Sequence, residues 1–205
     1  LNVSRIEQGR LKMKFAKINF VDLVVSVINE LQLKADTKKL YLKLEASKTG
    51  LPETFCDPDR IREVFVNLVG NSIKFTDKGG ITIKLEAGDH RLRAEVVDTG
   101  RGIAKEDQSK LFQKFSQINR EDDEHQGTGL GLYISKNFIE LHKGTIGVES
   151  ELGQGATFFF EIPILKSAPK EVEGAILDKP ISAAQIETGP KDIPAIVTES
   201  SKVRG

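Results

Sequence analysis

The sequence predicts an α+β fold, a two-layer sandwich in which about three helices cover one face of a mixed, mostly antiparallel sheet. Two patterns support this fold. Apolar residues recur every three to four positions in three segments, near residues 21–38, 57–74 and 128–142. Apolar and polar residues alternate in a hairpin near 81–96 and in two closing segments near 145–150 and 156–162. Each element therefore has one apolar face, and a shared core is expected between the helices and the sheet.

The first helix is expected over Val21–Lys38, after a strand near Lys14–Asn19 and before a strand near Leu40–Ala46. The second helix begins at Asp57, because an aspartate can cap free backbone N–H groups and Pro58 suits the first turn. Its core face consists of Ile61, Val64, Phe65, Leu68, Val69 and Ser72. A third helix is expected from Thr128 to His142, and its core face consists of Leu130, Tyr133, Ile134, Asn137, Phe138 and Leu141.

The hairpin has one buried face. Its first strand alternates Ile81, Ile83 and Leu85 with polar residues, and Gly88-Asp89-His90 forms the turn. The second strand directs Leu92, Ala94 and Val96 to the same side. Two further strands, Thr145–Ser150 and Ala156–Ile162, are expected to complete the sheet.

Composition excludes several classes of protein. The 205 residues contain 30 Lys and Arg against 30 Asp and Glu, and this zero net charge argues against a nucleic-acid binder. No stretch approaches the roughly 20 apolar residues of a membrane span. The single cysteine, Cys56, excludes an internal disulfide framework and suggests a reducing compartment. We therefore expect a cytoplasmic segment outside the membrane, whether or not the full-length protein has a membrane anchor.

The composition divides the chain into three parts. Residues 1–12 carry Val3 and Ile6 at helical spacing, which predicts the last turns of a helix and a linker. Residues 13–165 contain the periodic segments and form the domain. Residues 166–205 have no Phe or Tyr and contain four prolines, which predicts a flexible tail or linker. Because the chain begins with Leu1, we expect it to be a fragment of a longer protein.

Three polar residues follow one line of the second helix. Asn67, Asn71 and Lys74 are spaced i, i+4 and i+7, so they lie beside the apolar face. The amide oxygens suit a hydrated Mg²⁺, and the ammonium suits a phosphate. An ordinary solvated helix face would also explain three such residues.

The second strand of the hairpin ends in DTGRGI, residues 98–103. Gly100 and Gly102 let the backbone approach a flat ligand, and the carboxylate of Asp98 can fix its orientation. Because an ionised carboxylate only accepts hydrogen bonds, it would favour the amino group of adenine over the carbonyl of guanine. The alternative is a surface turn, where Asp and Gly are common.

Three glycines, Gly127, Gly129 and Gly131, open the third helix. Glycine is unfavourable inside helices, so their presence at this end suggests free backbone amides that meet an anion. The spacing fits neither a Walker loop nor the dinucleotide-binding fingerprint. About 25 residues separate this motif from DTGRGI, and a loop of that length predicts a mobile lid over a nucleotide.

These motifs together resemble a known family. NLVGNSIKF, DTGRGI, LFQKF, GTGLGL and ELGQGATFFFEIP occur in the order found in the catalytic ATP-binding domain of sensor histidine kinases. This domain, called HATPase_c or GHKL, has the Bergerat fold, which type II topoisomerases, mismatch-repair ATPases and large heat-shock chaperones share. The resemblance covers about Met13–Leu165. The opening LNVSRIEQGRLKM also resembles the end of the dimerisation helix that precedes this domain.

The resemblance implies a role for each motif residue. Asn71 would ligate the Mg²⁺ that bridges the ATP phosphates, Asn67 would assist it, and Lys74 would contact phosphate. Asp98 would bind the adenine amino group directly and through water. The remaining nucleotide-binding residues would be Gly100, Gly102, Ile103, Phe112, Phe115, Gly127, Thr128, Gly129, Leu130, Gly131 and Thr157. Among these, Phe112 and Phe115 would anchor the lid, and the Thr157 hydroxyl would join the network around Asp98.

The resemblance also implies the reaction and the partners. ATP hydrolases of the wider group carry a glutamate as general base where this chain has Asn67, so transfer of the γ-phosphoryl is expected rather than rapid hydrolysis. The acceptor would be a histidine on the dimerisation domain, which this chain lacks, in a full-length homodimer. A response regulator receiver domain would take the phosphoryl group next. Two alternatives remain: a degenerate nucleotide-binding or scaffold module, and an anti-sigma-type serine kinase.

Overall fold

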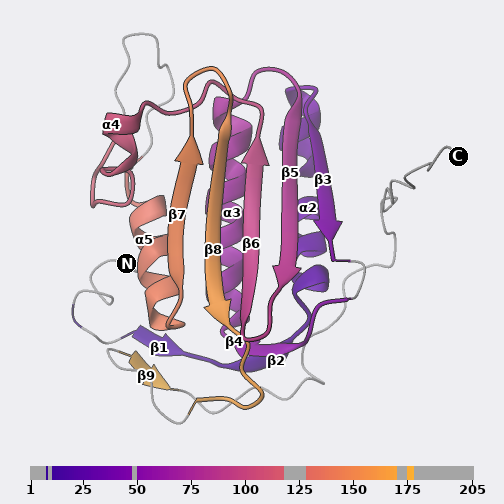
Figure 1. Ribbon diagram of the computed structural model, residues 1–205, viewed down its shortest axis with the longest axis vertical. Helices are drawn as coiled ribbons and strands as arrows, with labels where there is room; N and C mark the ends of the chain where they lie inside the picture. The colour runs from indigo at the N-terminus through magenta and orange to yellow at the C-terminus, as the bar shows by residue number, and fades with distance from the viewer. Residues whose placement is uncertain (1–7, 9–10, 48–49, 118–127, 170–174, 178–205) are drawn as a thin grey trace, which may run out of the picture.

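The computed structural model describes residues 8, 11–47, 50–117, 128–169 and 175–177. Its main sheet has five strands in the order β3-β5-β6-β8-β7 (Figure 1). Their bounds are β3 Tyr41–Ala46, β5 Gly80–Ala87, β6 Arg91–Asp98, β7 Thr145–Ser150 and β8 Ala156–Pro163. Strand β3 pairs in parallel with β5, and the other neighbours are antiparallel. The predicted mixed, mostly antiparallel sheet is confirmed.

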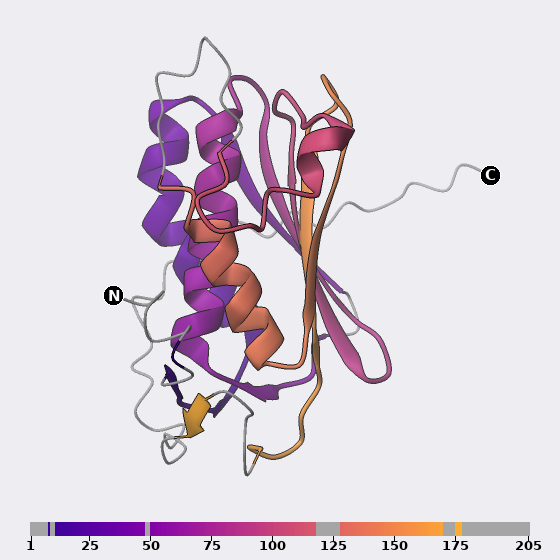
Figure 2. The same ribbon diagram turned by 90° about the vertical axis from the view of Figure 1, so that its left-hand side faces the viewer.

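Three long helices lie on one face of this sheet (Figure 2). They are α2 Phe20–Thr37, α3 Pro58–Phe75 and α5 Gly131–Leu141. A short helix, α4 Lys105–Gln108, lies at the end of the molecule where β6 ends (Figure 1). In the described part of the chain, no helix combines the length and apolar character that crossing a membrane requires. The two-layer α+β sandwich expected from the sequence is therefore present.

Local signals set the helix boundaries. Asn19 caps α2 through its side chain, which accepts a hydrogen bond from the Val21 N–H at 2.8 Å. Asp57 caps α3 as predicted, and its Oδ1 accepts from the Arg60 N–H at 3.1 Å. The third helix begins at Gly131 instead of Thr128. Gly129 has a φ of +66°, which no right-handed helical residue adopts, so the helix starts after it.

Two small sheets lie at the opposite end of the sandwich. The strand predicted over Lys14–Asn19 is the shorter strand β2 Ala16–Ile18, and an unpredicted strand, β1 Leu11–Met13, precedes it. Strand β2 pairs antiparallel with β4 Thr54–Cys56, and β1 pairs in parallel with β9 Ala175–Leu177. Leu11 is only 2% exposed, so the packed domain begins before Met13. Strand β9 lies within the segment predicted as a tail.

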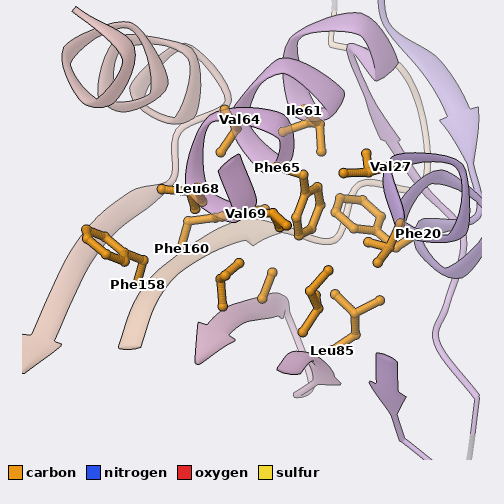
Figure 3. Close-up of a cluster of buried hydrophobic side chains, with 14 of the residues drawn as sticks. Phe20, Val27, Ile61, Val64, Phe65, Leu68, Val69, Leu85, Phe158 and Phe160 are labelled. Carbon is orange, nitrogen blue, oxygen red and sulfur yellow. The ribbon is translucent and has the colours of Figure 1, made fainter. Parts of the chain in front are cut away.

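The core lies between the sheet and the helices (Figure 3). Phe65 of α3 stands at its centre, with ring centroids 6.4 Å from Phe20 of α2 and 5.2 Å from Phe160 of β8. Both ring pairs have edge-to-face geometry, which aromatic quadrupoles favour. The predicted core face of α5 was partly wrong, because its buried residues are Ser135, Phe138 and Ile139. This packing holds α3 rigidly between α2 and α5.

Candidate functional site

Three chain segments meet at one end of the sandwich. Helix α3 ends there at Phe75, strand β6 ends at Asp98, and β8 begins at Ala156. Asp98 and Ala156 face each other across the β6–β8 pair. Helix α3 packs on β6, so its last turns lie beside the DTGRGI turn. The motifs that are far apart in the sequence are therefore neighbours in the fold.

Asp98 is buried, with 7% of its surface exposed, and three donors hold its carboxylate. Oδ2 accepts a hydrogen bond from Ser72 Oγ at 3.0 Å. Oδ1 accepts from the backbone N–H groups of Gly100 at 2.9 Å and Ala156 at 3.1 Å. Burial raises the pKa of this carboxyl, and the three hydrogen bonds oppose the rise because they favour the ionised form. The result is an acceptor of fixed orientation in a largely dry setting.

Both glycines of the DTGRGI turn are required by close backbone packing. A Cβ on Gly100 would lie 2.6 Å from the Phe75 carbonyl oxygen and 3.0 Å from Asp98 Oδ1. Gly102 has a φ of +69°, and a Cβ there would lie 2.0 Å from the carbonyl oxygen of Glu151. The sequence predicted that these glycines let the backbone approach a flat ligand. The contacts that require them in the structure are with the protein's own chain, and the approach to a ligand stays a prediction.

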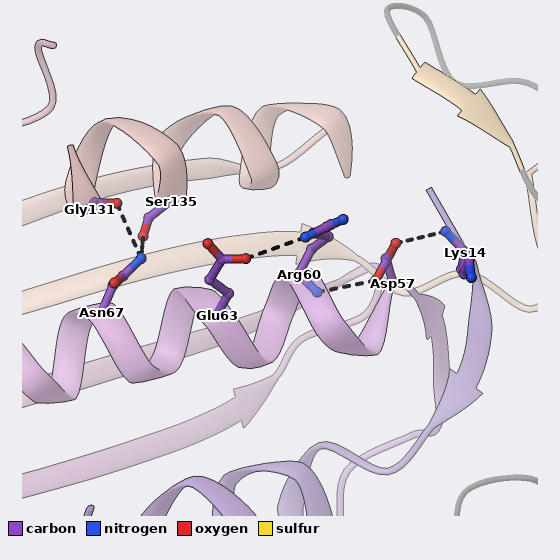
Figure 4. Close-up of polar contacts among 7 residues, drawn as sticks. All are labelled: Lys14, Asp57, Arg60, Glu63, Asn67, Gly131 and Ser135. Atoms are coloured by element: carbon purple, nitrogen blue, oxygen red, sulfur yellow. Dashed lines mark hydrogen bonds and ion pairs between the residues drawn. The ribbon is translucent and has the colours of Figure 1, made fainter. Parts of the chain in front are cut away.

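The polar line on α3 lies where the sequence placed it. Asn67, Asn71 and Lys74 are all half-buried beside the buried face of the helix. Asn67 Nδ2 donates weak hydrogen bonds to the Gly131 carbonyl at 3.4 Å and to Ser135 Oγ at 3.3 Å (Figure 4). Asn67 thus ties α3 to the first turn of α5. The side chain of Asn71 makes no hydrogen bond within the described residues.

Two cations gather beside the end of α3. Lys74 Nζ lies 4.8 Å from the ring centroid of Phe75, and the guanidinium carbon of Arg101 lies 4.9 Å from the same centroid. Arg101 lies between the two glycines of DTGRGI, and its role was not predicted from the sequence. Positive charge on both the helix and the turn suits an anionic ligand between them.

The donor set fits Mg²⁺ but contains no dedicated metal cage. The described residues hold no group of three His, Cys, Asp or Glu side chains close enough to bind a metal ion. Mg²⁺ commonly takes one or two protein oxygens and fills its other positions with water and substrate phosphate. The half-buried amide oxygen of Asn71 is a suitable protein ligand of this kind.

The residues predicted to line the base pocket and the lid are only partly brought together. The Ile103 N–H donates to Ser150 Oγ at 2.9 Å, and Phe112 packs partly buried on the core. Phe115 is 64% exposed, so its side chain does not pack into the body of the domain. Its backbone lies close to the glycine motif instead, since a Cβ on Gly129 would lie 2.7 Å from the Phe115 carbonyl carbon. Gly127 lies outside the described residues.

The start of α5 carries the rest of the glycine motif. Leu130 is the N-cap residue of α5, and Thr128 before it is exposed. Gly131 approaches α3 closely, because a Cβ on it would lie 3.4 Å from Asn67 Oδ1. The first turn of α5 is therefore held against the polar line of α3.

The structure does not bring Thr157 to Asp98. Side chains alternate along β8, and Ala156 and Phe158 are buried towards the helices while Thr157 lies on the other face of the sheet. The hydroxyl that reaches Asp98 is that of Ser72, which the sequence analysis assigned to the core face of α3. The one sign of this role in the sequence was that Ser72 is a polar residue within the otherwise apolar face of α3.

A second hydroxyl lies beside the same carboxylate. Thr76 is fully buried, and its Oγ1 has no hydrogen-bond partner within the described residues. It lies 3.1 Å from the position of a Cβ on Gly100, the residue whose N–H donates to Asp98. A buried hydroxyl favours a partner, so a ligand or a bound water is suited to this position.

A match to a protein-family model shows which family the chain belongs to. Residues 56–166 match the model of the histidine kinase-, DNA gyrase B- and HSP90-like ATPases. The chain belongs to this family. The matched residues include α3, the DTGRGI turn, α5 and β8, which together build the site described above.

The relatives that the chain resembles include histidine kinases and sensor proteins of bacteria. It is 36% identical over 166 residues to the circadian input-output histidine kinase CikA of Synechococcus elongatus, an alignment that covers 80% of this chain and 22% of the relative. It is 37% identical over 179 residues to the sensor protein GacS of Pseudomonas syringae, which covers 84% of this chain and 20% of the relative. Within the family, the chain is thus a catalytic domain of the sensor histidine kinase type. It spans only a part of these longer proteins.

Solved structures agree with this assignment. The catalytic domain of the histidine kinase ThkA superimposes with a TM-score of 0.66 at 31% identity, covering 75% of this chain and 99% of ThkA's. Full-length ShkA, solved with AMPPNP, gives a TM-score of 0.72 at 31% identity, covering 82% of this chain and 35% of ShkA's. The fold of the histidine kinase catalytic domain is therefore shown for this chain.

Proposed function

We propose that this chain binds Mg-ATP at the site around Asp98 and transfers the γ-phosphoryl to a histidine on another domain of the longer protein. The observation that carries the proposal is the carboxylate of Asp98, held by Ser72, Gly100 and Ala156 at the end of β6. A buried acceptor of fixed direction selects a ligand by its donor pattern. The amino group of adenine matches this acceptor.

The two glycine motifs and the polar line of α3 would hold the rest of the nucleotide. The base lies against the turn of Gly100, Gly102 and Ile103, where the Thr76 hydroxyl can bind a water shared with Asp98. Lys74 would contact phosphate, and Asn71, with help from Asn67, would present its amide oxygen to Mg²⁺. Mg²⁺, when bound, neutralises the developing charge on the phosphates. The start of α5 closes on the phosphates through Gly129 and Gly131.

The same residues favour transfer over hydrolysis. Asn67 occupies the position from which a carboxylate could activate water, and an amide cannot accept a proton there. Its Nδ2 is directed at Gly131 and Ser135 of α5, which suits a positioning role. Phosphoryl transfer depends mainly on positioning and charge neutralisation, which this site can supply.

The acceptor histidine is expected outside this chain. His142 is 4% exposed, its Nδ1 donates to the Phe138 carbonyl at 2.7 Å, and its Nε2 accepts from the Asp57 N–H at 2.9 Å. Both ring nitrogens are therefore occupied, and neither can attack a phosphate. His90 lies in the β5–β6 turn, far along β6 from Asp98, and His125 is outside the described residues.

The proposed partners follow from this reaction. The acceptor belongs to the dimerisation and histidine phosphotransfer domain of the same protein, which is a homodimer at full length. The receiver domain of a response regulator takes the phosphoryl group from that histidine. Because ATP is the phosphoryl donor, we place the catalytic segment in the cytoplasm.

The test is phosphoryl transfer by the full-length protein with γ-labelled ATP. We expect the wild type to become labelled on a histidine. In the Asn71→Asp variant, this labelling should be lost or should depend differently on Mg²⁺. Label that is independent of magnesium would contradict the role of Asn71. Absence of histidine label in a protein that binds ATP would favour the scaffold alternative, and label on a serine would favour the serine-kinase alternative.

A further inference from the structure

Hydrogen bonds at the C-terminus of α2 fix the backbone position of one lysine, Lys38. The Lys39 N–H donates to the Asp36 carbonyl at 2.9 Å, and the Leu40 N–H donates to the Ala35 carbonyl at 3.0 Å. These two bonds form a Schellman motif, and Lys39 takes the left-handed conformation that the motif requires, with a φ of +58°. Lys38 is the C-cap residue, so its backbone is fixed at the point where α2 ends.

The side chain of Lys38 closes the end of the neighbouring helix. Its Nζ donates hydrogen bonds to the carbonyl oxygens of Ile73 at 3.0 Å, Lys74 at 2.8 Å and Thr76 at 3.0 Å. The last carbonyls of an α-helix lack partners within the helix and carry the negative end of its dipole. One ammonium with three donors therefore satisfies two of these helix carbonyls, those of Ile73 and Lys74, and the carbonyl of the C-cap residue Thr76.

The fourth carbonyl of this turn faces the nucleotide site. The Phe75 oxygen lies 2.6 Å from the position of a Cβ on Gly100, so the end of α3 packs directly on the DTGRGI turn. The N–H of Gly100 in turn holds Asp98 Oδ1. Lys74, which the proposed function assigns to phosphate, is one of the residues whose carbonyl Lys38 holds.

We infer that Lys38 is a positioning residue for the nucleotide site: by fixing the last turn of α3, it sets the distance between the phosphate side of the site and the adenine side. This inference rests on the proposed function. Lys38 touches neither ATP nor metal in this account. It acts through the backbone of residues 73–76, which lies between Asn71 and Gly100.

The test compares three variants in affinity, melting temperature and amide chemical shifts. Lys38→Met removes the ammonium and keeps the length of the side chain. Lys34→Met is the matched control, because Lys34 is an exposed lysine one turn earlier on the same helix. Lys38→Arg keeps the charge, but its planar guanidinium does not present donors in the three directions that the compact ammonium does.

Binding of a slowly hydrolysed ATP analogue with Mg²⁺ should weaken about tenfold in Lys38→Met, a change of about 1.4 kcal/mol. Lys34→Met should bind as the wild type does, and Lys38→Arg should lie between the two. In the nucleotide-free protein, the amide signals of Gly100 and residues 73–76 should shift in Lys38→Met and stay in place in Lys34→Met. The affinity loss should remain at temperatures far below the melting temperature of each variant.

Wild-type affinity in a folded Lys38→Met, or an unmoved Gly100 signal, would overturn the inference. A lower melting temperature alone, without those changes, would show a merely structural role and would also overturn it. If Lys38→Met does not fold, Lys38→Arg decides by the same two readouts. Failure of the wild type to bind ATP would count against the proposed function, and the Gly100 signal would still test Lys38.

Discussion

At the scale of single residues, the site depends on how hydroxyl groups are placed around one carboxylate. Ser72 donates to Asp98 from within the buried face of α3, and Thr76 brings a second hydroxyl one turn later. Thr157, in contrast, lies on the opposite face of the sheet. Sequence spacing does not distinguish these cases, because strand alternation and helix rotation decide which hydroxyl reaches the carboxylate.

This arrangement predicts that removing the Ser72 hydroxyl changes ATP affinity and that removing the Thr157 hydroxyl does not. Ser72→Ala should weaken ATP binding, because Asp98 loses a donor that fixes its direction; a buried hydrogen bond to a charged group contributes about 1.5–3 kcal/mol. Thr157→Val should leave ATP affinity unchanged. Calorimetric titration of both variants with an ATP analogue measures the difference. A loss in Thr157→Val with none in Ser72→Ala would reverse our assignment.

At the scale of elements, the end of α3 and the DTGRGI turn form one unit, held by Lys38 on one side and packed on Gly100 on the other. Glycine has a different role within this unit than it has in the middle of α3. A Cβ on Gly70 would meet nothing within 4 Å, whereas a Cβ on Gly100 would meet the Phe75 carbonyl at 2.6 Å. The two positions therefore offer a matched pair of substitutions.

Gly70→Ala should stabilise the protein by about 0.5–1 kcal/mol, because alanine is favoured over glycine inside a helix and its methyl group has space here. Gly100→Ala should reduce both stability and ATP affinity, because the turn must move away from α3. Urea unfolding and nucleotide titration of both variants measure these effects. If the two variants had the same unfolding free energy and the same ATP affinity, the contact between the DTGRGI turn and α3 would contribute to neither.

Much of the fold could be predicted from the sequence, because the long elements carry strong periodic patterns. Helix α3 begins at the predicted Asp57 cap, and β7 has the predicted bounds Thr145–Ser150. Strands β1, β4 and β9 were missed, since three-residue strands have no periodicity and form through contacts with distant segments. The start of α5 was placed too early because the positive φ of Gly129 is a property of its packing on Phe115.

Some residues of the site could likewise be predicted from the sequence, and others could not. The motif residues Asp98, Gly100 and Gly102 could be predicted because each belongs to a recognisable local pattern, and they do lie together at the end of β6. Ser72 and Lys38 could not, since their role exists only when α2, α3 and β6 pack together. A serine in an apolar stripe and a lysine at a helix end are both common features with no functional meaning by themselves.

At the scale of the whole molecule, one buried histidine joins three elements. His142 follows α5 and accepts a hydrogen bond from the Asp57 N–H at the start of α3. Its ring centroid lies 5.3 Å from that of Phe15, which stands between β1 and β2, and the two rings are tilted by 50°. The Asp57 carboxylate also accepts from the Lys14 N–H at 2.7 Å (Figure 4). The junction requires a neutral imidazole, because Nε2 must accept a hydrogen bond.

This junction predicts how stability depends on pH. Burial lowers the pKa of His142 from its ordinary value of 6.5, more than the Phe138 hydrogen bond and the Asp57 charge raise it. As pH falls below 6.5, the unfolded chain takes up the proton first, so the unfolding free energy falls until the lower folded-state pKa is reached. The slope is at most about 1.4 kcal/mol per pH unit.

Urea unfolding of the wild type and of His142→Gln between pH 7 and 5 measures this effect. The difference in unfolding free energy between the two proteins should shrink as the pH falls, because only the wild type has this group to protonate. A difference that is constant over this range would show that His142 does not titrate between the folded and unfolded states.

We propose that Asp98 makes this site selective for adenine, and calorimetric titration in the presence of Mg²⁺ is the measurement that tests this proposal. The protein and its Asp98→Asn variant are titrated with slowly hydrolysed analogues of ATP and GTP, and circular dichroism confirms that the variant is folded. We expect the ATP analogue to bind to the wild type but not to Asp98→Asn, and the GTP analogue to bind to neither protein. Equal affinity of Asp98→Asn for the ATP analogue, or equal affinity of the wild type for both nucleotides, would contradict it.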